Sequence, residues 1–170
     1  MRSSSFETNQ DVDTFAALQI PERLLIWGCR TWLACCRARN CPMDQLERVF
    51  SHFGAVEAAA SLDALLCATA QTAIRAIDVR CPRCARLSED EVRLLYAAAA
   101  AQRRDFETAR AHLQHWLSAP VADWALGPTC GLGALFKNAG LILPFRPEPE
   151  DLGDSVETTR DHGARRCHLH

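Results

Sequence analysis

The tetrad Ser88-Glu89-Asp90-Glu91 constrains the fold of this chain more than any other short segment, because it predicts where a helix begins. A serine followed three residues later by a glutamate can form a capping box, in which each side chain binds the other residue's backbone N–H. Helical periodicity follows directly, and an alanine run over 97–101 would let a neighbouring helix approach closely. The apolar face of this predicted helix consists of Val92, Leu95, Tyr96 and Ala99.

Apolar spacing predicts helices along most of the remaining chain. Alanine is abundant and β-branched residues are sparse, a composition that favours helix over strand. The last predicted helix contains Gly127-Pro128, which leaves a break there as an alternative. The sequence therefore predicts an all-α fold, a compact bundle of about six helices with short loops. Besides the helix that begins at Ser88, the predicted helices cover residues 21–39, 42–53, 55–76, 106–117 and 121–139.

The chain length fits one domain flanked by two polar segments. We predict a flexible N-terminal arm over 1–19, a helical domain over 20–146 and a flexible C-terminal tail over 147–170. Gly140 is expected to end the last helix, and residues 141–144 to close over the core as an extended strap. The terminal Cys167-His168-Leu169-His170 could chelate metal adventitiously, and we exclude it from the fold prediction.

The predicted helix over 21–39 is apolar around most of its circumference. Arg23, Arg30 and Arg37 recur at a spacing of seven and form its one polar stripe. A helix that faces water along one narrow stripe is either central to a bundle or buried against a partner chain. We therefore take Trp27 and Trp32 of this helix as candidate protein-binding residues.

Cys81-Pro82-Arg83-Cys84 is the most specific short motif in the chain. Two thiolates separated by two residues can bind one metal ion, and a structural zinc site needs four ligands. Cys36 and Cys41 could supply the missing pair if the end of the helix over 21–39 meets the link over 77–87, with His52 and Cys67 as further candidates. The plainer alternative is that both cysteines belong to a surface link without metal.

The motif also resembles the Cys-Pro-x-Cys of glutaredoxin-type thiol oxidoreductases, which implies redox chemistry at Cys81. That chemistry uses a thiol at a helix N-terminus, and here the next helix begins at Ser88. Arginines flank the motif and could bind an acidic partner or form a salt-bridging surface with nearby carboxylates. The cationic candidates for protein binding are Arg80, Arg83 and Arg86.

Residues 88–118 resemble a tetratricopeptide-type helical hairpin, with small residues at close-packing positions and Gln-Arg-Arg-Asp-Phe at its turn. The resemblance implies binding of peptides or partner proteins. No second copy of the pattern is present in the sequence, so a repeat array is not predicted. The second helix of the hairpin is expected to bury Phe106, Ala109, Leu113, Trp116 and Leu117, while His112 and His115 are expected at the surface.

Charge and composition argue against several classes of protein. The formal net charge is −2, and the helix after Gly54, which would be the recognition helix of a helix-turn-helix, carries Glu57 and Asp63 with no basic residue before Arg75, so nucleic-acid binding is not predicted. No apolar stretch has the length of a signal sequence or a membrane span, and we expect a cytoplasmic protein with no membrane partner. Its nine cysteines are then expected to be reduced, without a disulfide framework.

We expect no catalytic site, because phosphate loops, nucleophile elbows and paired carboxylates are absent from the sequence. The favoured prediction is a non-enzymatic helical module that contacts another protein or a second copy of itself, as an adaptor, regulator or assembly factor in a cytosol of the bacterial type. Cofactors are not expected, although zinc is possible; the main alternative is a metal-binding helical protein in which Cys81 and Cys84 anchor zinc or iron. A thiol redox protein is the third alternative.

Overall fold

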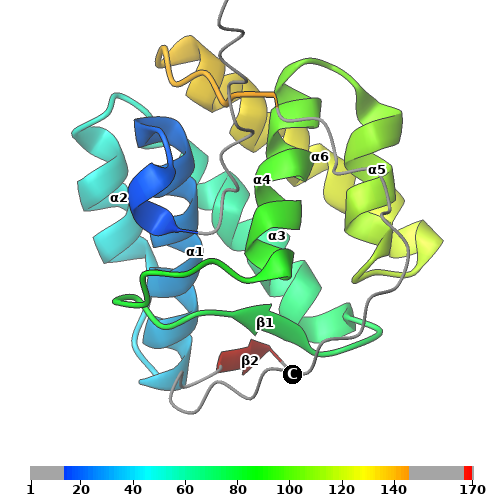
Figure 1. Ribbon diagram of the computed structural model, residues 1–170, viewed down its shortest axis with the longest axis horizontal. Helices are drawn as coiled ribbons and strands as arrows, with labels where there is room; N and C mark the ends of the chain where they lie inside the picture. The colour runs from blue at the N-terminus through cyan, green and yellow to red at the C-terminus, as the bar shows by residue number, and fades with distance from the viewer. Residues whose placement is uncertain (1–13, 146–166, 170) are drawn as a thin grey trace, which may run out of the picture.

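The computed structural model describes residues 14–145 and 167–169, and its helices pack around one core (Figure 1). The predicted all-α bundle is confirmed, with most boundaries shifted by a few residues. The third helix is shorter than predicted: it begins at Ala58 and ends at Thr72. The six α-helices are α1 (Ile20–Arg37), α2 (Met43–Ser51), α3 (Ala58–Thr72), α4 (Glu89–Gln102), α5 (Phe106–Gln114) and α6 (Ala119–Asn138).

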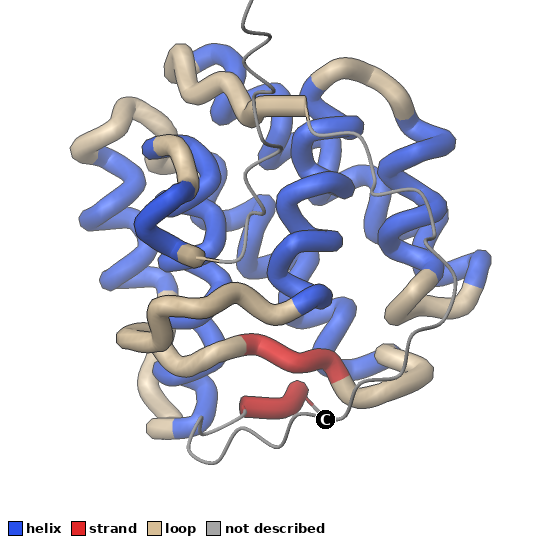
Figure 2. The backbone as a smooth tube through the Cα atoms, viewed as in Figure 1, coloured by secondary structure: helices blue, strands red, loops and turns tan. Residues whose placement is uncertain are grey.

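Two short strands lie beside each other at one side of the helices (Figure 2). Strand β1 (Ile77–Val79) follows α3, and strand β2 (Cys167–Leu169) comes from the predicted C-terminal tail. They are antiparallel, with Ile77 opposite Leu169 and Val79 opposite Cys167. The polar composition of the tail did not indicate this pairing. The rest of the tail beyond 145 and residues 1–13 of the predicted arm lie outside the described residues.

Helix α1 is covered by its own chain, because it packs against α2, α3, α4 and β1. Its apolar circumference is therefore explained by a central place in the bundle, without a partner chain. The predicted polar stripe is correct at Arg23 and Arg37, which are exposed, but wrong at Arg30, which is buried. Arg30 points into the protein because a carboxylate on α4 meets it there.

Helices α4 and α5 form the predicted hairpin, and α6 packs against both. The alanine run of α4 is buried as expected, and α6 comes so close that a Cβ on Gly133 would lie 2.9 Å from the backbone nitrogen of Gln102. Two expectations for α5 were wrong. Phe106 is 46 % exposed because it opens the first turn of α5, whereas His112 is 5 % exposed and its ring lies 5.4 Å from that of Tyr96.

Helix α6 runs through Pro128 without a break, and buried residues on both sides of the proline hold it against the core. Gly140 then adopts a left-handed φ of 75°, and the predicted strap follows. Gln102 at the end of α4 holds this strap, since its amide nitrogen donates to the Leu141 carbonyl and its oxygen accepts from the Leu143 N–H. Within the described residues, no helix has both the length and the apolar character to cross a membrane.

Candidate functional site

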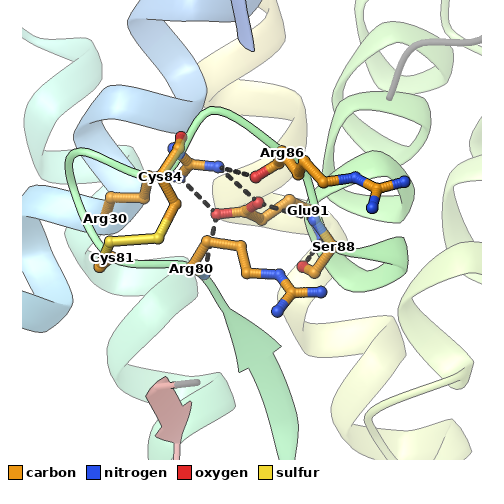
Figure 3. Close-up of a disulfide and its surroundings, with 7 residues drawn as sticks. All are labelled: Arg30, Arg80, Cys81, Cys84, Arg86, Ser88 and Glu91. Carbon is orange, nitrogen blue, oxygen red and sulfur yellow. Dashed lines mark hydrogen bonds and ion pairs between the residues drawn. A yellow bond between two sulfur atoms is a disulfide. The ribbon is translucent and has the colours of Figure 1, made fainter. Parts of the chain in front are cut away.

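The link between α3 and α4 carries the Cys-Pro-Arg-Cys motif, and a buried ion pair stands behind it (Figure 3). Arg30 of α1 and Glu91 of α4 form two hydrogen bonds, at 2.7 Å from Nε to Oε1 and 2.9 Å from Nη2 to Oε2. Both side chains are almost completely buried. Charged groups this deep in a protein need several hydrogen bonds to offset the loss of water.

The ion pair obtains those hydrogen bonds from the backbone of the link. Arg30 donates to the carbonyls of Cys84 at 2.6 Å and Arg86 at 3.0 Å. Glu91 accepts from the N–H of Arg80 at 3.1 Å and from that of Ser88 at 2.9 Å. The pair therefore fixes the link on both sides of the motif, and Glu91 serves the capping box and the ion pair at once.

The end of the N-terminal arm closes over the same link. The N–H of Phe15 donates to the carbonyl of Ala85 at 2.7 Å, and Thr14 forms an isolated bridge with Arg86. The Phe15 ring lies 5.4 Å from the guanidinium carbon of Arg30, a distance at which a cation and a ring face attract each other. These contacts shield the buried arginine from the side of the arm.

Asp90 forms a second anchor at the start of α4. Its carboxylate accepts two hydrogen bonds from Arg75, one from the Asp78 N–H at 2.8 Å and one from the Trp116 indole at 2.9 Å. Burial by itself would raise the pKa of Asp90, but these hydrogen bonds outweigh it and hold the pKa below its ordinary value. Asp90 thus ties β1 and the end of α5 to α4 as a charged group.

Cys81 and Cys84 are joined in a disulfide, with their Cα atoms 5.3 Å apart. The expectation that all cysteines are reduced thiols was wrong at this pair. The physical reason is the turn at Pro82-Arg83, in which the Cys84 N–H donates to the Cys81 carbonyl at 3.0 Å and brings the two sulfurs together. The pair does not lie at a helix N-terminus, since α4 begins at Glu89, so the thiol redox function stays a prediction.

The other predicted metal ligands lie elsewhere. Cys36 and Cys41 are exposed near the end of α1, where Cys36 interacts with Cys67 and Asp63 of α3. Burial, followed by the charge of Asp63, raises the pKa of both the Cys36 and Cys67 thiols. No group of three or more histidine, cysteine or acidic side chains is arranged to hold a metal ion within the residues that the structure describes.

The predicted protein-binding residues are divided between surface and core. The Arg83 and Arg86 side chains are exposed, and Arg80 lies 3.6 Å from the carboxylate of Asp78. Trp27 is half-buried against the core. Trp32 lies in the core at 4 % exposure, and its indole donates to Asp63 at 2.7 Å.

A groove that the sequence did not indicate lies between the end of α4, the start of α5 and α6. Its volume is about 430 Å³. Phe106 supplies an exposed aromatic ring, and Arg104 and Lys137 supply cationic groups. The sequence signal that could have indicated it is the position of Phe106 in the first turn of a predicted helix, directly after Arg103-Arg104-Asp105. The lining residues are Ala101, Gln102, Arg104, Phe106, Cys130, Ala134, Lys137 and Asn138.

No protein-family model, curated protein or solved structure matches this chain. The resemblances of residues 88–118 and of the Cys-Pro-Arg-Cys motif therefore stay predictions.

Proposed function

We propose that this protein is a non-enzymatic helical module that binds an acidic, amphipathic helix of another protein in the groove between α4, α5 and α6. The observation that supports this proposal is the groove itself, with its apolar floor and cationic rim. Its volume of about 430 Å³ falls in the range of sites that receive a few anchoring side chains. An adaptor, regulator or assembly factor would use such a site.

The floor of the groove suits an apolar anchor. Ala101 and Ala134 are small and leave the space open, while Phe106 exposes its ring beside them. When a partner covers an aromatic ring at the edge of a pocket, apolar surface is removed from water, and this favours binding. Aromatic residues in such positions are the ones that dominate binding energy at protein interfaces.

The rim of the groove selects the charge of the partner. Arg104 and Lys137 lie among the lining residues, and none of those residues is acidic. The nearest carboxylate in sequence, Asp105, accepts from the Thr108 N–H as the cap of α5. Carboxylates on either side of an apolar anchor would therefore be attracted to this site, and lysines would be repelled.

The test uses the full chain and a labelled amphipathic peptide of about 16 residues, long enough for helix to form on binding. The peptide carries leucines and phenylalanine at helical spacing with glutamates beside them, and a second peptide has lysines in place of the glutamates. We expect the acidic peptide alone to bind, measured by fluorescence anisotropy. Phe106→Ala and Lys137→Glu should each weaken binding at least about tenfold, or about 1.4 kcal/mol.

Ile74→Ala is the matched control, because Ile74 is 64 % exposed on another part of the surface. It should leave the anisotropy curve unchanged. Equal binding of both peptides, no binding of either, or an equal loss in Ile74→Ala would each contradict the proposal. Self-association by light scattering that Phe106→Ala abolishes would also contradict it, because the groove would then bind a second copy of the chain.

A further inference from the structure

The disulfide between Cys81 and Cys84 contributes little to holding the fold together. The two residues are three positions apart in the same link, so the bond joins no two helices or strands. A disulfide stabilises a fold mainly by closing a long loop in the unfolded chain, and this one closes a very short loop. A structural role therefore accounts poorly for this bond.

The link also keeps its place without the disulfide. Glu91 accepts a hydrogen bond from the Arg80 N–H just before the pair, at 3.1 Å. Arg30 donates to the Cys84 carbonyl at the end of the pair. Between these anchors, the Cys84 N–H donates to the Cys81 carbonyl and keeps the chain in a turn. None of these hydrogen bonds involves a sulfur atom (Figure 3), so the bond between the sulfurs can break and form again in the folded protein.

The pair lies where a reagent in solution can approach it. Cys81 and Cys84 are half-buried, and Pro82 and Arg83 between them are exposed. Thiol–disulfide exchange needs a thiolate that reaches one of the two sulfurs. Residues 80–86 carry no large apolar side chain of the kind that forms the centre of a protein interface, so a small thiol suits this turn better than a protein does.

The charge of the segment favours an anionic thiol. The charged residues of 81–89 are Arg83, Arg86 and Glu89, which gives two positive charges and one negative. Both arginine side chains are exposed, and neither forms an ion pair with another residue that the structure describes. Cationic groups attract anions and favour the thiolate form of a cysteine beside them. The Arg86 side chain points away from the disulfide (Figure 3), whereas Arg83 stands between the two cysteines in the chain.

We infer that Cys81 and Cys84 are a reversible redox couple that accepts two electrons from small thiols carrying a carboxylate, while the protein stays folded. Arg83 would attract the carboxylate of the thiol. The buried pair of Arg30 and Glu91 would hold the link in both redox states. This activity belongs to the link and is independent of the groove.

The exchange balances with two molecules of the thiol. A thiolate attacks one sulfur of the pair, the bond between the Cys81 and Cys84 sulfurs breaks, and a mixed disulfide forms. The other cysteine leaves as a thiolate and takes up a proton. A second thiolate then attacks the sulfur of the first thiol in the mixed disulfide, and the second cysteine leaves and takes up a proton. Two thiols are thereby oxidised to one disulfide, and the pair gains two electrons and two protons.

The test reduces the full chain with 3-mercaptopropionate, a thiol acid, and with cysteamine, a thiol amine of similar size. Samples are quenched by alkylation, and mass spectrometry of the peptide that contains residues 81–84 measures the rate. We expect 3-mercaptopropionate to reduce the pair and an excess of its disulfide to restore the bond. Far-UV circular dichroism and hydrogen exchange at the Phe15 amide should be the same in both states, because the anchors on either side of Ala85 remain.

Arg83→Glu tests the choice of thiol. It should slow reduction by 3-mercaptopropionate by at least about fivefold, the scale of one charge interaction in water, and speed reduction by cysteamine. Comparing each thiol with itself cancels the difference in reactivity between the two reagents. Arg48→Glu is the matched control, because it makes the same change of charge at an exposed position of α2, and it should leave both rates unchanged.

Several results would overturn the inference. Loss of helical circular dichroism on reduction would make the bond a structural one. A pair that 3-mercaptopropionate does not reduce in the folded protein, or that its disulfide does not restore, would not be a redox couple. Equal effects of Arg83→Glu on the two thiols, or equal effects of Arg83→Glu and Arg48→Glu, would remove the preference for an anionic thiol.

Discussion

The two ends of α4 each hold a segment without helical structure, but they do so with different chemistry. At the first turn, the carboxylates of Asp90 and Glu91 bind the link, with Arg30 and Arg75 as their cationic partners. At the last turn, the neutral amide of Gln102 binds the strap through Leu141 and Leu143. One helix therefore places a charged anchor beside the Cys-Pro-Arg-Cys motif and a neutral anchor beside the groove.

The free-energy cost of removing each anchor depends on its charge. A buried ion pair loses much of its hydration, so removing one partner leaves an uncompensated charge in the core. Removing a buried amide side chain leaves backbone groups without hydrogen-bond partners, and this costs less free energy of folding. The link should therefore be held more rigidly than the strap, and it should also be more sensitive to a single substitution.

The largest effect is expected for Glu91→Gln. The substitution keeps the size of the side chain but removes the charge that compensates Arg30, whose side chain is almost completely buried. We expect the free energy of unfolding to fall by about 3–5 kcal/mol. Urea unfolding followed by circular dichroism at pH 7 measures this change.

The double variant Arg30→Met/Glu91→Leu is the control for charge as the cause. Replacing both partners by apolar residues of similar volume removes the buried charges together, so the double variant should recover part of the stability lost in Glu91→Gln, while the link backbone still lacks the hydrogen bonds that the pair made. A double variant as unstable as Glu91→Gln would show that the hydrogen bonds to the link backbone, rather than the charge, carry the stabilisation.

These anchors also show how far local sequence patterns predict the fold. The capping box at Ser88 and Glu91 was predictable, because both of its hydrogen bonds join residues three positions apart. The ion pair of Glu91 with Arg30 was not, because its partners are 61 positions apart and a helical wheel assigned Arg30 to the wet stripe. Helical periodicity predicts from a helix's own residues which of its faces is apolar. It does not identify the residues of other helices that lie against each face.

The candidate sites were predictable only in part, for the same reason. The Cys-Pro-Arg-Cys motif is contiguous in sequence, and it lies in the predicted link. The pairing of β1 with β2 was not predictable, because each strand has three residues, too few to show an alternating pattern. The groove joins the ends of three helices, so it exists only after α4, α5 and α6 are packed together.

A smaller effect is expected at the other end of α4, for Gln102→Leu. Leucine fills a similar volume, but the Leu143 N–H and the Leu141 carbonyl lose their hydrogen bonds in a buried place. We expect a loss of about 1–3 kcal/mol in the free energy of unfolding. Ile142→Ala, an exposed position on the same strap, should change stability by no more than about 0.5 kcal/mol. A loss equal to that of Glu91→Gln would remove the distinction between the two anchors.

The smallest effect concerns pH, and it should be confined to the first turn of α4. The pKa of Asp90 is lower in the folded protein than the value of about 3.9 for an unfolded aspartate. Between the two pKa values the unfolded chain binds more protons, so the stabilisation by Asp90 is complete above about pH 4 and is lost as the pH falls through the folded pKa.

Asp90→Asn cannot gain or lose that proton, so the difference in stability between wild type and Asp90→Asn should shrink as the pH is lowered from 7 to about 3. Gln102→Leu, whose anchor is neutral, should keep a constant difference from the wild type over the same range. Urea unfolding of the three proteins at several pH values measures both differences. A constant difference for Asp90→Asn would mean that the hydrogen bonds from Arg75, Asp78 and Trp116 do not favour the charged carboxylate, and the contrast in charge between the two ends of α4 would then rest on Glu91 alone.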